Sequence, residues 1–282
     1  MGHPNSTVPV VMSFSASDPS GGAGIQADIE ALGSMGCHCS PIITTVTAQD
    51  TTDMYHFYPC PSRLVRDQAR AVLEDIPIAA FKVGILGSIE NIRAVHQLLK
   101  DYPHIPVVLD PCLYFGSKSK PIDPAALEAI IALLLPFVTI CTPNTQEARL
   151  MAPEADTLDA CAQEIMAHGA NYVLITGQHQ ISNKITNTFY GNYRRLEVFH
   201  WDRLENNYQG SGCTLTASLA GLLAQGLSAS SAIHQAQEYT AECLKQGFRI
   251  GMGQHHPNRL FWARETSYQY DAQQEQQKKI VN

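Results

Sequence analysis

Short apolar segments alternate with amphipathic segments along most of this chain, and that alternation restricts its fold more than any other feature. The first, residues 8–15 (VPVVMSFS), is rich in β-branched residues and is typical of a buried strand. The alternation predicts an α/β fold with a central, mostly parallel sheet and helices on both faces. Further strands are expected at residues 41–46, 79–83, 106–109, 138–141 and 172–176, and helices at residues 25–35, 62–73, 88–99, 124–135, 158–168, 212–224 and 228–246.

The pattern changes near residue 186. Residues 186–203 are rich in aromatic side chains and break at Gly191 and Asn192, which predicts an antiparallel hairpin. No linker-like segment divides the chain, and 282 residues suit one large domain. We therefore predict a single domain over residues 1–262, followed by a frayed polar tail over residues 263–282, which lack apolar periodicity.

Composition excludes several classes of protein. The net charge of -7 disfavours binding to nucleic acid or to an anionic membrane, because both need a basic surface. The sequence has no run of about 18 apolar residues, the length that a membrane span needs, and no signal peptide is evident. The 8 cysteines form no C-x-x-C pair, so neither a zinc site nor a disulfide framework is expected. A reducing cytoplasm fits this cysteine usage best.

The clearest chemical signal is the loop at residues 209–214 (QGSGCT), at the start of a predicted helix. Glycines let consecutive backbone N–H groups point one way, and the helix N-terminus adds positive potential, so the loop suits a transferring phosphoryl group. We expect this field, together with a bound Mg²⁺-nucleotide, to outweigh burial and to lower the pKa of Cys213. The alternative is an ordinary Gly-rich turn that contains a buried cysteine.

Two other loops follow predicted strands. In residues 20–28 (SGGAGIQAD), glycines allow close approach of a ligand, although the spacing is neither a dinucleotide fingerprint nor a Walker loop. The alternative is a tight turn in which Asp28 stabilises a helix N-terminus. Asn144 and Glu147, three residues apart, can order Mg²⁺ near phosphates. The same spacing fits a capping box, which is the simpler interpretation.

In this order, the motifs resemble the hydroxymethylpyrimidine/phosphomethylpyrimidine kinases of thiamin biosynthesis, which belong to the ribokinase-like superfamily. The resemblance runs from about residue 8 to residue 248. Ribokinase-like sugar kinases usually have Asp where Cys213 stands, so a Cys there points to the pyrimidine kinases or to a related branch of pyridoxal kinases. The motifs are residues 21–28 (GGAGIQAD), 47–49 (TAQ), 82–88 (KVGILGS), 109–111 (LDP), 142–144 (TPN) with Glu147, and 210–214 (GSGCT).

The resemblance implies a ribokinase-like fold, a homodimer and two successive ATP-dependent phosphorylations with Mg²⁺. The substrates are 4-amino-5-hydroxymethyl-2-methylpyrimidine and then its monophosphate. By the same resemblance, the residues that hold the pyrimidine are Ala23, Asp28, Gln49, Ile85 and Cys112.

The remaining site residues are also implied by the resemblance. The phosphoryl group would lie on the backbone amides of Gly210, Ser211, Gly212 and Cys213, and Cys213 would act as base or as part of the anion hole. Asp110 and Glu147 would hold Mg²⁺. Asn144, Thr176 and Gly177 would face the nucleotide.

The chain departs from the family pattern mainly on the nucleotide side. Thr176 stands where the family has a Lys that faces the nucleotide phosphates, and Gln209 replaces a His. Lost positive charge predicts weak ATP binding, because phosphoryl transfer depends on electrostatic stabilisation. Lys118, Lys120 or Lys184 could compensate. Two alternatives stay open: a pyridoxal kinase of the same fold, and a diverged pyrimidine-binding protein with little kinase activity.

Overall fold

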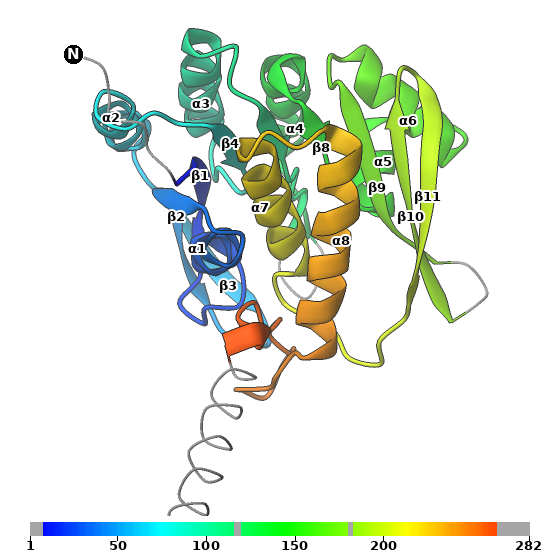
Figure 1. The fold of residues 1–282 in the computed structure, drawn as a ribbon. Coiled ribbons are helices and arrows are strands. Elements are labelled where there is room, and N and C mark those ends of the chain that lie inside the picture. Colours follow the sequence, from blue (N-terminus) through cyan, green and yellow to red (C-terminus); the bar gives the residue numbers. More distant parts are fainter. Residues whose placement is uncertain (1–7, 116–119, 180–182, 264–282) are drawn as a thin grey trace, which may run out of the picture.

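A nine-stranded sheet forms the centre of the molecule (Figure 1). The structure is a computed structural model that describes residues 8–115, 120–179 and 183–263. The strand order is β11-β10-β9-β8-β5-β4-β1-β2-β3. The strands are β1 (Val10–Ser17), β2 (His38–Gln49), β3 (Met54–Pro59), β4 (Ala80–Val83), β5 (Val107–Leu109), β8 (Ile140–Cys141), β9 (Tyr172–His179), β10 (Lys184–Gly191) and β11 (Arg194–Asp202); β6 (Tyr114–Phe115) and β7 (Lys120–Pro121) pair separately.

Most of the sheet is parallel, as predicted. Strands β2, β1, β4, β5, β8 and β9 run parallel to one another, and β10 and β11 form the expected antiparallel hairpin, with β10 also antiparallel to β9. The edge strand β3, antiparallel to β2, was not expected. Five of its six residues are exposed, so it lacks the apolar pattern by which a buried strand is recognised.

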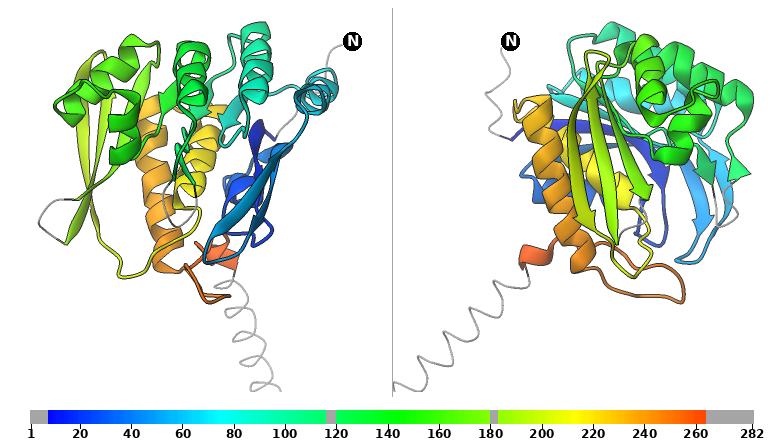
Figure 2. Two further views of the ribbon diagram at one scale, coloured as in Figure 1. Left: turned by 180° about the vertical axis from the view of Figure 1, so that it is seen from behind. Right: turned by 90° about the vertical axis from the view of Figure 1, so that its right-hand side faces the viewer.

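Helices cover both faces of the sheet (Figures 1 and 2). Each face has its own apolar core: the first packs under α2 to α6, and the second under α1, α7 and α8. The first group is α2 (Ser62–Leu73), α3 (Ile89–Asp101), α4 (Pro124–Ala129), α5 (Thr145–Met151) and α6 (Leu158–Ala167). The second group is α1 (Gly24–Ser34), α7 (Ser211–Ala224) and α8 (Ala229–Lys245).

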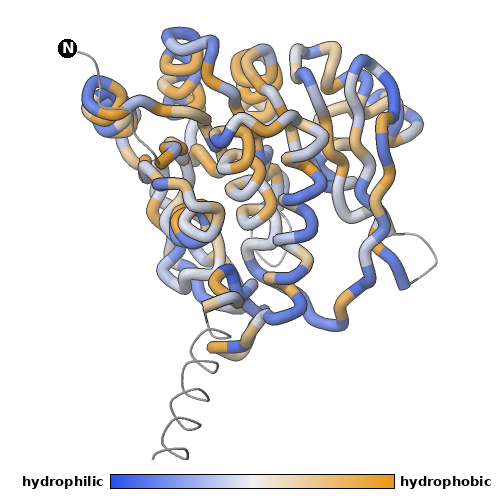
Figure 3. Tube along the Cα trace, viewed as in Figure 1, coloured by the Kyte–Doolittle hydropathy of each residue, from blue (hydrophilic) through white to orange (hydrophobic). Residues whose placement is uncertain are grey.

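Helix α7 is the most enclosed helix of the second face. Residues 214–222 are all buried, because the sheet, α1 and α8 surround this helix. Figure 3 shows α7 as mainly apolar, whereas α8 is hydrophilic along its outer side. The packing fixes the N-terminus of α7 firmly against the carboxyl ends of the central strands.

One predicted helix has a different form. The segment expected to be helical over residues 124–135 is α-helical only over Pro124–Ala129 and continues as a π-helix (Ile130–Leu134) and a 3-10 turn (Leu135–Phe137). Pro136 contributes to the ending, because it has no N–H to donate an α-helical hydrogen bond.

No described helix is both long and apolar enough to cross a membrane. The predicted polar tail, apart from Ala263, lies outside the described residues.

Candidate active site

The carboxyl ends of β1, β4 and β5 meet the N-terminus of α7 around a small cavity of about 40 Å³. Ligands of open α/β sheets bind at this edge. The wall includes Ala23, Gln49, Ile85, Cys112 and Cys213, which the sequence placed at the site. Its other residues are Ser15, Ala16, Asp18, Gly24, Met54, Lys82 and Gly84.

A buried ion pair lies directly behind this cavity. Lys82 Nζ is 2.9 Å from Asp28 Oδ2, both side chains are fully buried, and Ser13 Oγ donates to the same oxygen at 2.6 Å. Burial by itself lowers the pKa of Lys82, but Asp28, with Cys213 and Asp110, raises it above its usual value. Lys82 is therefore a permanent cation on the cavity wall. Asp28, expected to contact the pyrimidine, contacts Lys82 and is not among the residues that line the cavity.

Cys213 lies in the first turn of α7, as predicted, but its pKa is shifted in the opposite direction. Burial raises the pKa of Cys213 to about 11, although Lys82 and the backbone of Gly24 act to lower it. The helix N-terminus therefore does not by itself outweigh burial, and the part of the expectation that depends on a bound Mg²⁺-nucleotide stays a prediction. The loss of hydration is the larger effect, and Asp110 and Asp28 add negative charge nearby.

Two buried carboxyl groups continue the site from α7 towards β8. Asp110 follows β5, and its Oδ2 is 3.4 Å from the position that a Cβ atom on Gly212 would take. Burial raises the pKa of Asp110, and burial together with Asp110 raises the pKa of Glu147 to about 7. Glu147 Oε1 accepts the N–H of Leu113 at 3.0 Å. The pair is a site where added positive charge is favourable.

The residues expected to face the nucleotide are engaged locally. Asn144 caps α5: its Oδ1 accepts the N–H groups of Gln146 and Glu147, and Glu147 Oε2 accepts that of Asn144, so the capping box is confirmed. Thr176 forms an isolated parallel β-bridge with Asn144. The N–H of Gly177 donates to Asn187 Oδ1 at 3.0 Å.

The two Gly-rich loops are held together by side chains that the sequence analysis did not identify as site residues. Gln209 Nε2 donates to Asp18 Oδ2 at 2.9 Å. Arg259 is almost fully buried; its guanidinium donates to Thr214 Oγ1 at 2.8 Å, to Glu30 Oε2 at 3.0 Å and to the carbonyl of Gly22. Gly210 has a φ of 81° and packs against that carbonyl, so a side chain there would clash. The position of α7 relative to residues 18–24 is thus fixed.

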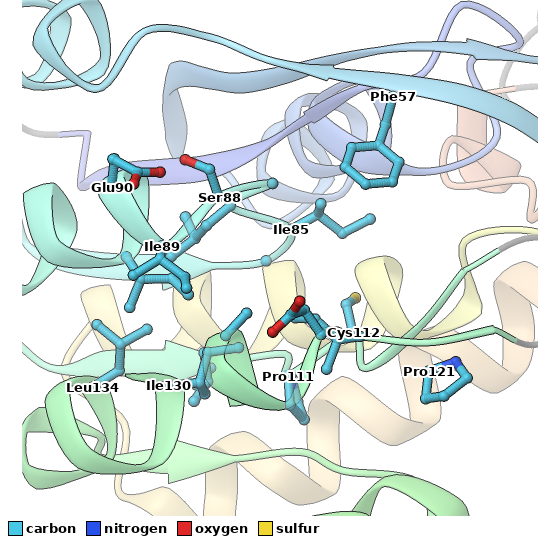
Figure 4. Close-up of a pocket in the computed structure, with 18 residues that line it drawn as sticks. Phe57, Ile85, Ser88, Ile89, Glu90, Pro111, Cys112, Pro121, Ile130 and Leu134 are labelled. Atoms are coloured by element: carbon cyan, nitrogen blue, oxygen red, sulfur yellow. The ribbon is translucent and has the colours of Figure 1, made fainter. Parts of the chain in front are cut away.

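Two larger cavities flank the site. One of about 620 Å³ lies between β10, β11, α7 and α8, and Lys184, Asn187, Trp201, Ser211 and Lys245 are among its wall residues. Thr176 and Gly177 are not among the described residues that line it. The other, of about 410 Å³, is mainly apolar, lies beside α3 and α4, and shares Gly84, Ile85 and Cys112 with the small cavity (Figure 4).

Sequence reasoning missed Lys82 and Arg259 for different reasons. Lys82 stands in an apolar strand (AFKV), where a lysine needs a buried anion, and Asp28 is such a partner. That signal was available. Arg259 is separated from its partners by up to 237 residues and lies near the end of the described chain, where no local pattern marks it.

The described residues contain no group of three or more His, Cys, Asp or Glu side chains arranged to hold a metal ion. Asp110 and Glu147 nevertheless fit Mg²⁺, which commonly binds one or two carboxylates together with substrate phosphates.

Comparison with known proteins is consistent with this geometry. The family described as phosphomethylpyrimidine kinase matches residues 18–258. A hydroxymethylpyrimidine/phosphomethylpyrimidine kinase of Streptomyces coelicolor is 34% identical over 258 residues, which cover 89% of this chain and 94% of the relative.

Solved structures agree. The chain is similar to a Bacillus subtilis pyridoxal kinase in an ADP complex, with a TM-score of 0.79, 27% identity, and coverage of 90% of this chain and 99% of that one. It is also similar to a phosphomethylpyrimidine kinase of Clostridium difficile, with a TM-score of 0.72, 29% identity, and coverage of 84% and 100%.

Proposed function

Because the chain belongs to the phosphomethylpyrimidine kinase family, we propose that its active site phosphorylates a hydroxymethylpyrimidine alcohol and then the resulting monophosphate, with ATP as donor. The chain is a phosphotransferase of the ribokinase-like fold. The observation that carries the proposal is the convergence of Gln49, Lys82 and Cys213 on one cavity at the N-terminus of α7. This cavity places polar groups for a heteroaromatic ring beside an anion-binding helix end.

Gln49 is the residue that suits the edge of an aminopyrimidine. Its side-chain amide offers both an acceptor and donors, which match the exocyclic amine and ring nitrogens. Ile85 and Cys112 supply apolar contact, and Asp28 acts through Lys82. A cavity of about 40 Å³ has room for only a few water molecules, so the walls must move apart to admit a ring.

The first turn of α7 is the part of the site that suits the transferring phosphoryl group. The backbone N–H groups of residues 210–213 lie where the helix dipole favours negative charge. Cys213 either accepts the proton of the substrate hydroxyl or, as a thiol, contributes to the anion hole. Lys82 contributes a fixed positive charge close to both.

Asp110 and Glu147 are the residues that would hold Mg²⁺. Their pKa values are raised by burial, and that of Glu147 also by Asp110, so a cation between them would relieve an existing electrostatic cost. Bound there, Mg²⁺ would neutralise charge on the phosphates. The capping box of α5 fixes the orientation of Glu147.

The cavity of about 620 Å³ is the best candidate for the nucleotide. It reaches Ser211 at the start of α7 and has an aromatic wall residue, Trp201, for a base. Lys184 and Lys245 on its wall supply positive charge that Thr176 does not. Lys184 is one of the lysines that the sequence offered as compensation.

Pyridoxal phosphorylation is the second candidate, because the overall structure is similar to a pyridoxal kinase. Both substrates are heteroaromatic alcohols that would present a hydroxymethyl group to Cys213. The expected homodimer and the cytoplasmic location stay proposals from the family resemblance.

A steady-state assay with ATP and Mg²⁺ tests the function against three substrates: the pyrimidine alcohol, its monophosphate and pyridoxal. We expect the highest kcat/KM with the pyrimidine alcohol and a measurable second phosphorylation. Gln49→Leu should raise KM at least about 10-fold, because ring polar groups lose their partner. A preference for pyridoxal would favour the second candidate, and no transfer to any of the three would overturn the proposal.

A further inference from the structure

The larger apolar cavity near the active site has no part in the proposed reaction. It has a volume of about 410 Å³, within the usual range for small-molecule pockets, and it opens partly to solvent. Its walls include Ile89 and Ile92 of α3, Ala126 of α4, and Ile130 and Leu134 of the π-helix. π-helical turns are frequent at functional sites. The cavity therefore has the size and the wall of a binding site.

Only a thin wall separates this cavity from the small one at α7. Gly84, Ile85 and Cys112 line both cavities, so the partition consists of two side chains and a glycine. Figure 4 shows Ile85 and Cys112 near the middle of the apolar cavity, with Ile89, Glu90 and Leu134 towards one end. Cys112 has a φ of 45°, a backbone conformation that is unfavourable for a non-glycine residue and that recurs at ligand sites.

The two cavities lie towards opposite faces of the sheet. Helix α7 packs on one face, and the walls of the apolar cavity belong to the core under α3 and α4 on the other. A ring whose hydroxymethyl group faces Cys213 directs its opposite ring carbon away from α7. That direction leads past Ile85 and Cys112 into the apolar cavity.

The charge of the wall restricts what can enter. The described wall residues include Glu90 and Asp123 but no Lys, Arg or His. A phosphate or carboxylate group would therefore be repelled, whereas an uncharged apolar group would displace only poorly held water.

We propose that this cavity is a second substrate subsite, which accepts an apolar substituent on the ring carbon opposite the reacting hydroxymethyl group. The proposal rests on the proposed function and names a wider substrate class for it: alkyl-extended aminopyrimidine alcohols. Ile85 and Cys112 act as the boundary between the reacting part of the substrate and its apolar extension.

The test compares the 2-methyl pyrimidine alcohol with its 2-propyl analogue on the full-length protein. Two extra buried methylene groups should tighten binding of the analogue roughly 10-fold in calorimetry. Ala126→Phe fills the cavity from α4, and Ile130→Phe fills it from the π-helix. Each should cancel that gain and leave kcat/KM for the 2-methyl compound within about 2-fold of wild type. Ala125→Phe, an exposed position on the same helix, is the matched control and should change neither substrate.

The outcomes separate this subsite from the reaction itself. If the wild type binds the propyl analogue more weakly than the methyl compound, or if both filling variants leave its advantage intact, the subsite does not exist. If neither compound is phosphorylated, the proposed function is wrong, while calorimetry still shows whether the extension occupies the cavity. If one filling variant fails to fold, the other decides the result.

Discussion

The proposed substrate side and the proposed nucleotide side of the active site meet at the N-terminus of α7, but they hold their positive charge in different ways. On the substrate side, Lys82 is fully buried and fixed by Asp28. On the nucleotide side, Lys184 is an exposed residue 3.8 Å from Asp202. One cation is thus part of the protein core, and the other lies on a solvent-facing wall.

This difference explains how the two sides can diverge separately. A buried cation cannot be lost without leaving an unpaired carboxylate, which is costly. An exposed cation contributes little to stability and can be replaced from a neighbouring strand. The substrate side has Lys82, whereas the proposed nucleotide side has Thr176 within β9 and lysines on the cavity wall instead.

The largest expected effect concerns Cys213, where the two sides meet. If its sulfur accepts the substrate proton, Cys213→Ala should lower kcat by about 10²–10⁴-fold with little change in KM, the usual contribution of a general base. Cys213→Asp should retain part of the activity. Because the pKa is about 11, alkylation by iodoacetamide should be slow at neutral pH, accelerate as the pH rises towards that pKa, and be slowed by substrate.

Cys243→Ala is the matched control, because Cys243 is also buried with a pKa of about 11 but lies in α8, away from the small cavity. Its removal should alter stability and leave kcat unchanged. Near-full turnover of Cys213→Ala would assign catalysis to the backbone amides and the metal.

The next effect tests the buried cation directly. Lys82→Met leaves Asp28 charged and unpaired in the core and should lower the free energy of unfolding by about 3–5 kcal/mol in urea denaturation. Asp28→Asn combined with Lys82→Met should recover part of this loss. Lys184→Met, the exposed counterpart, should change stability by less than about 1 kcal/mol. Equal urea midpoints for the two single variants would remove the distinction between the two sides.

Much of the fold was predictable because the central strands are buried on both faces. Their continuous apolar runs, each followed by a polar loop, identify the strands without tertiary information. The edge strand β3 was not predicted, because its mostly exposed residues carry no such apolar pattern. The π-helix at Ile130–Leu134 was not predicted, because apolar periodicity over so short a segment does not distinguish i→i+5 from i→i+4 hydrogen bonding.

The site was predictable where a loop carries its own chemistry. The motifs located Ala23, Gln49, Ile85, Cys112 and Cys213, which share one cavity. The sequence did not reveal how burial and charge combine at Cys213, where burial raises the pKa. The lysine in an apolar strand signalled a buried anion, but not that Asp28 is that anion. Both depend on distances between segments far apart in the chain.

A smaller effect is expected on the nucleotide side. Thr176→Lys should lower the KM for ATP, because one charge-assisted contact is worth about 1.5–3 kcal/mol, or roughly 10–150-fold. Thr176→Met adds a long side chain without charge and should leave the KM near that of wild type. An unchanged KM in Thr176→Lys would mean that another residue already supplies the charge. In that case Lys184→Met should raise the KM.

The smallest effect concerns the segment that contains His256 and Arg259, both of which contact Gly22 in the first Gly-rich loop. His256 is buried beside Gly22, its Nε2 has no hydrogen-bond partner within the described part of the chain, and burial, with Arg259, lowers its pKa. Below its normal pKa of about 6.5 the unfolded chain binds a proton that the folded protein resists. This residue therefore destabilises the fold as the pH falls below that value. Glu147, with a pKa raised to about 7, acts in the opposite direction and stabilises the fold as the pH falls over the same range, so the measurement must be a difference between variants.

His256→Gln removes the titrating group and should make the melting temperature fall less than that of wild type between pH 7 and pH 5. His234→Gln, on the exposed surface of α8, is the control and should follow wild type. If the curves of melting temperature against pH are parallel for wild type and His256→Gln, His256 accepts its proton in the folded state. The segment that holds the two Gly-rich loops together would then open more readily than its buried contacts indicate.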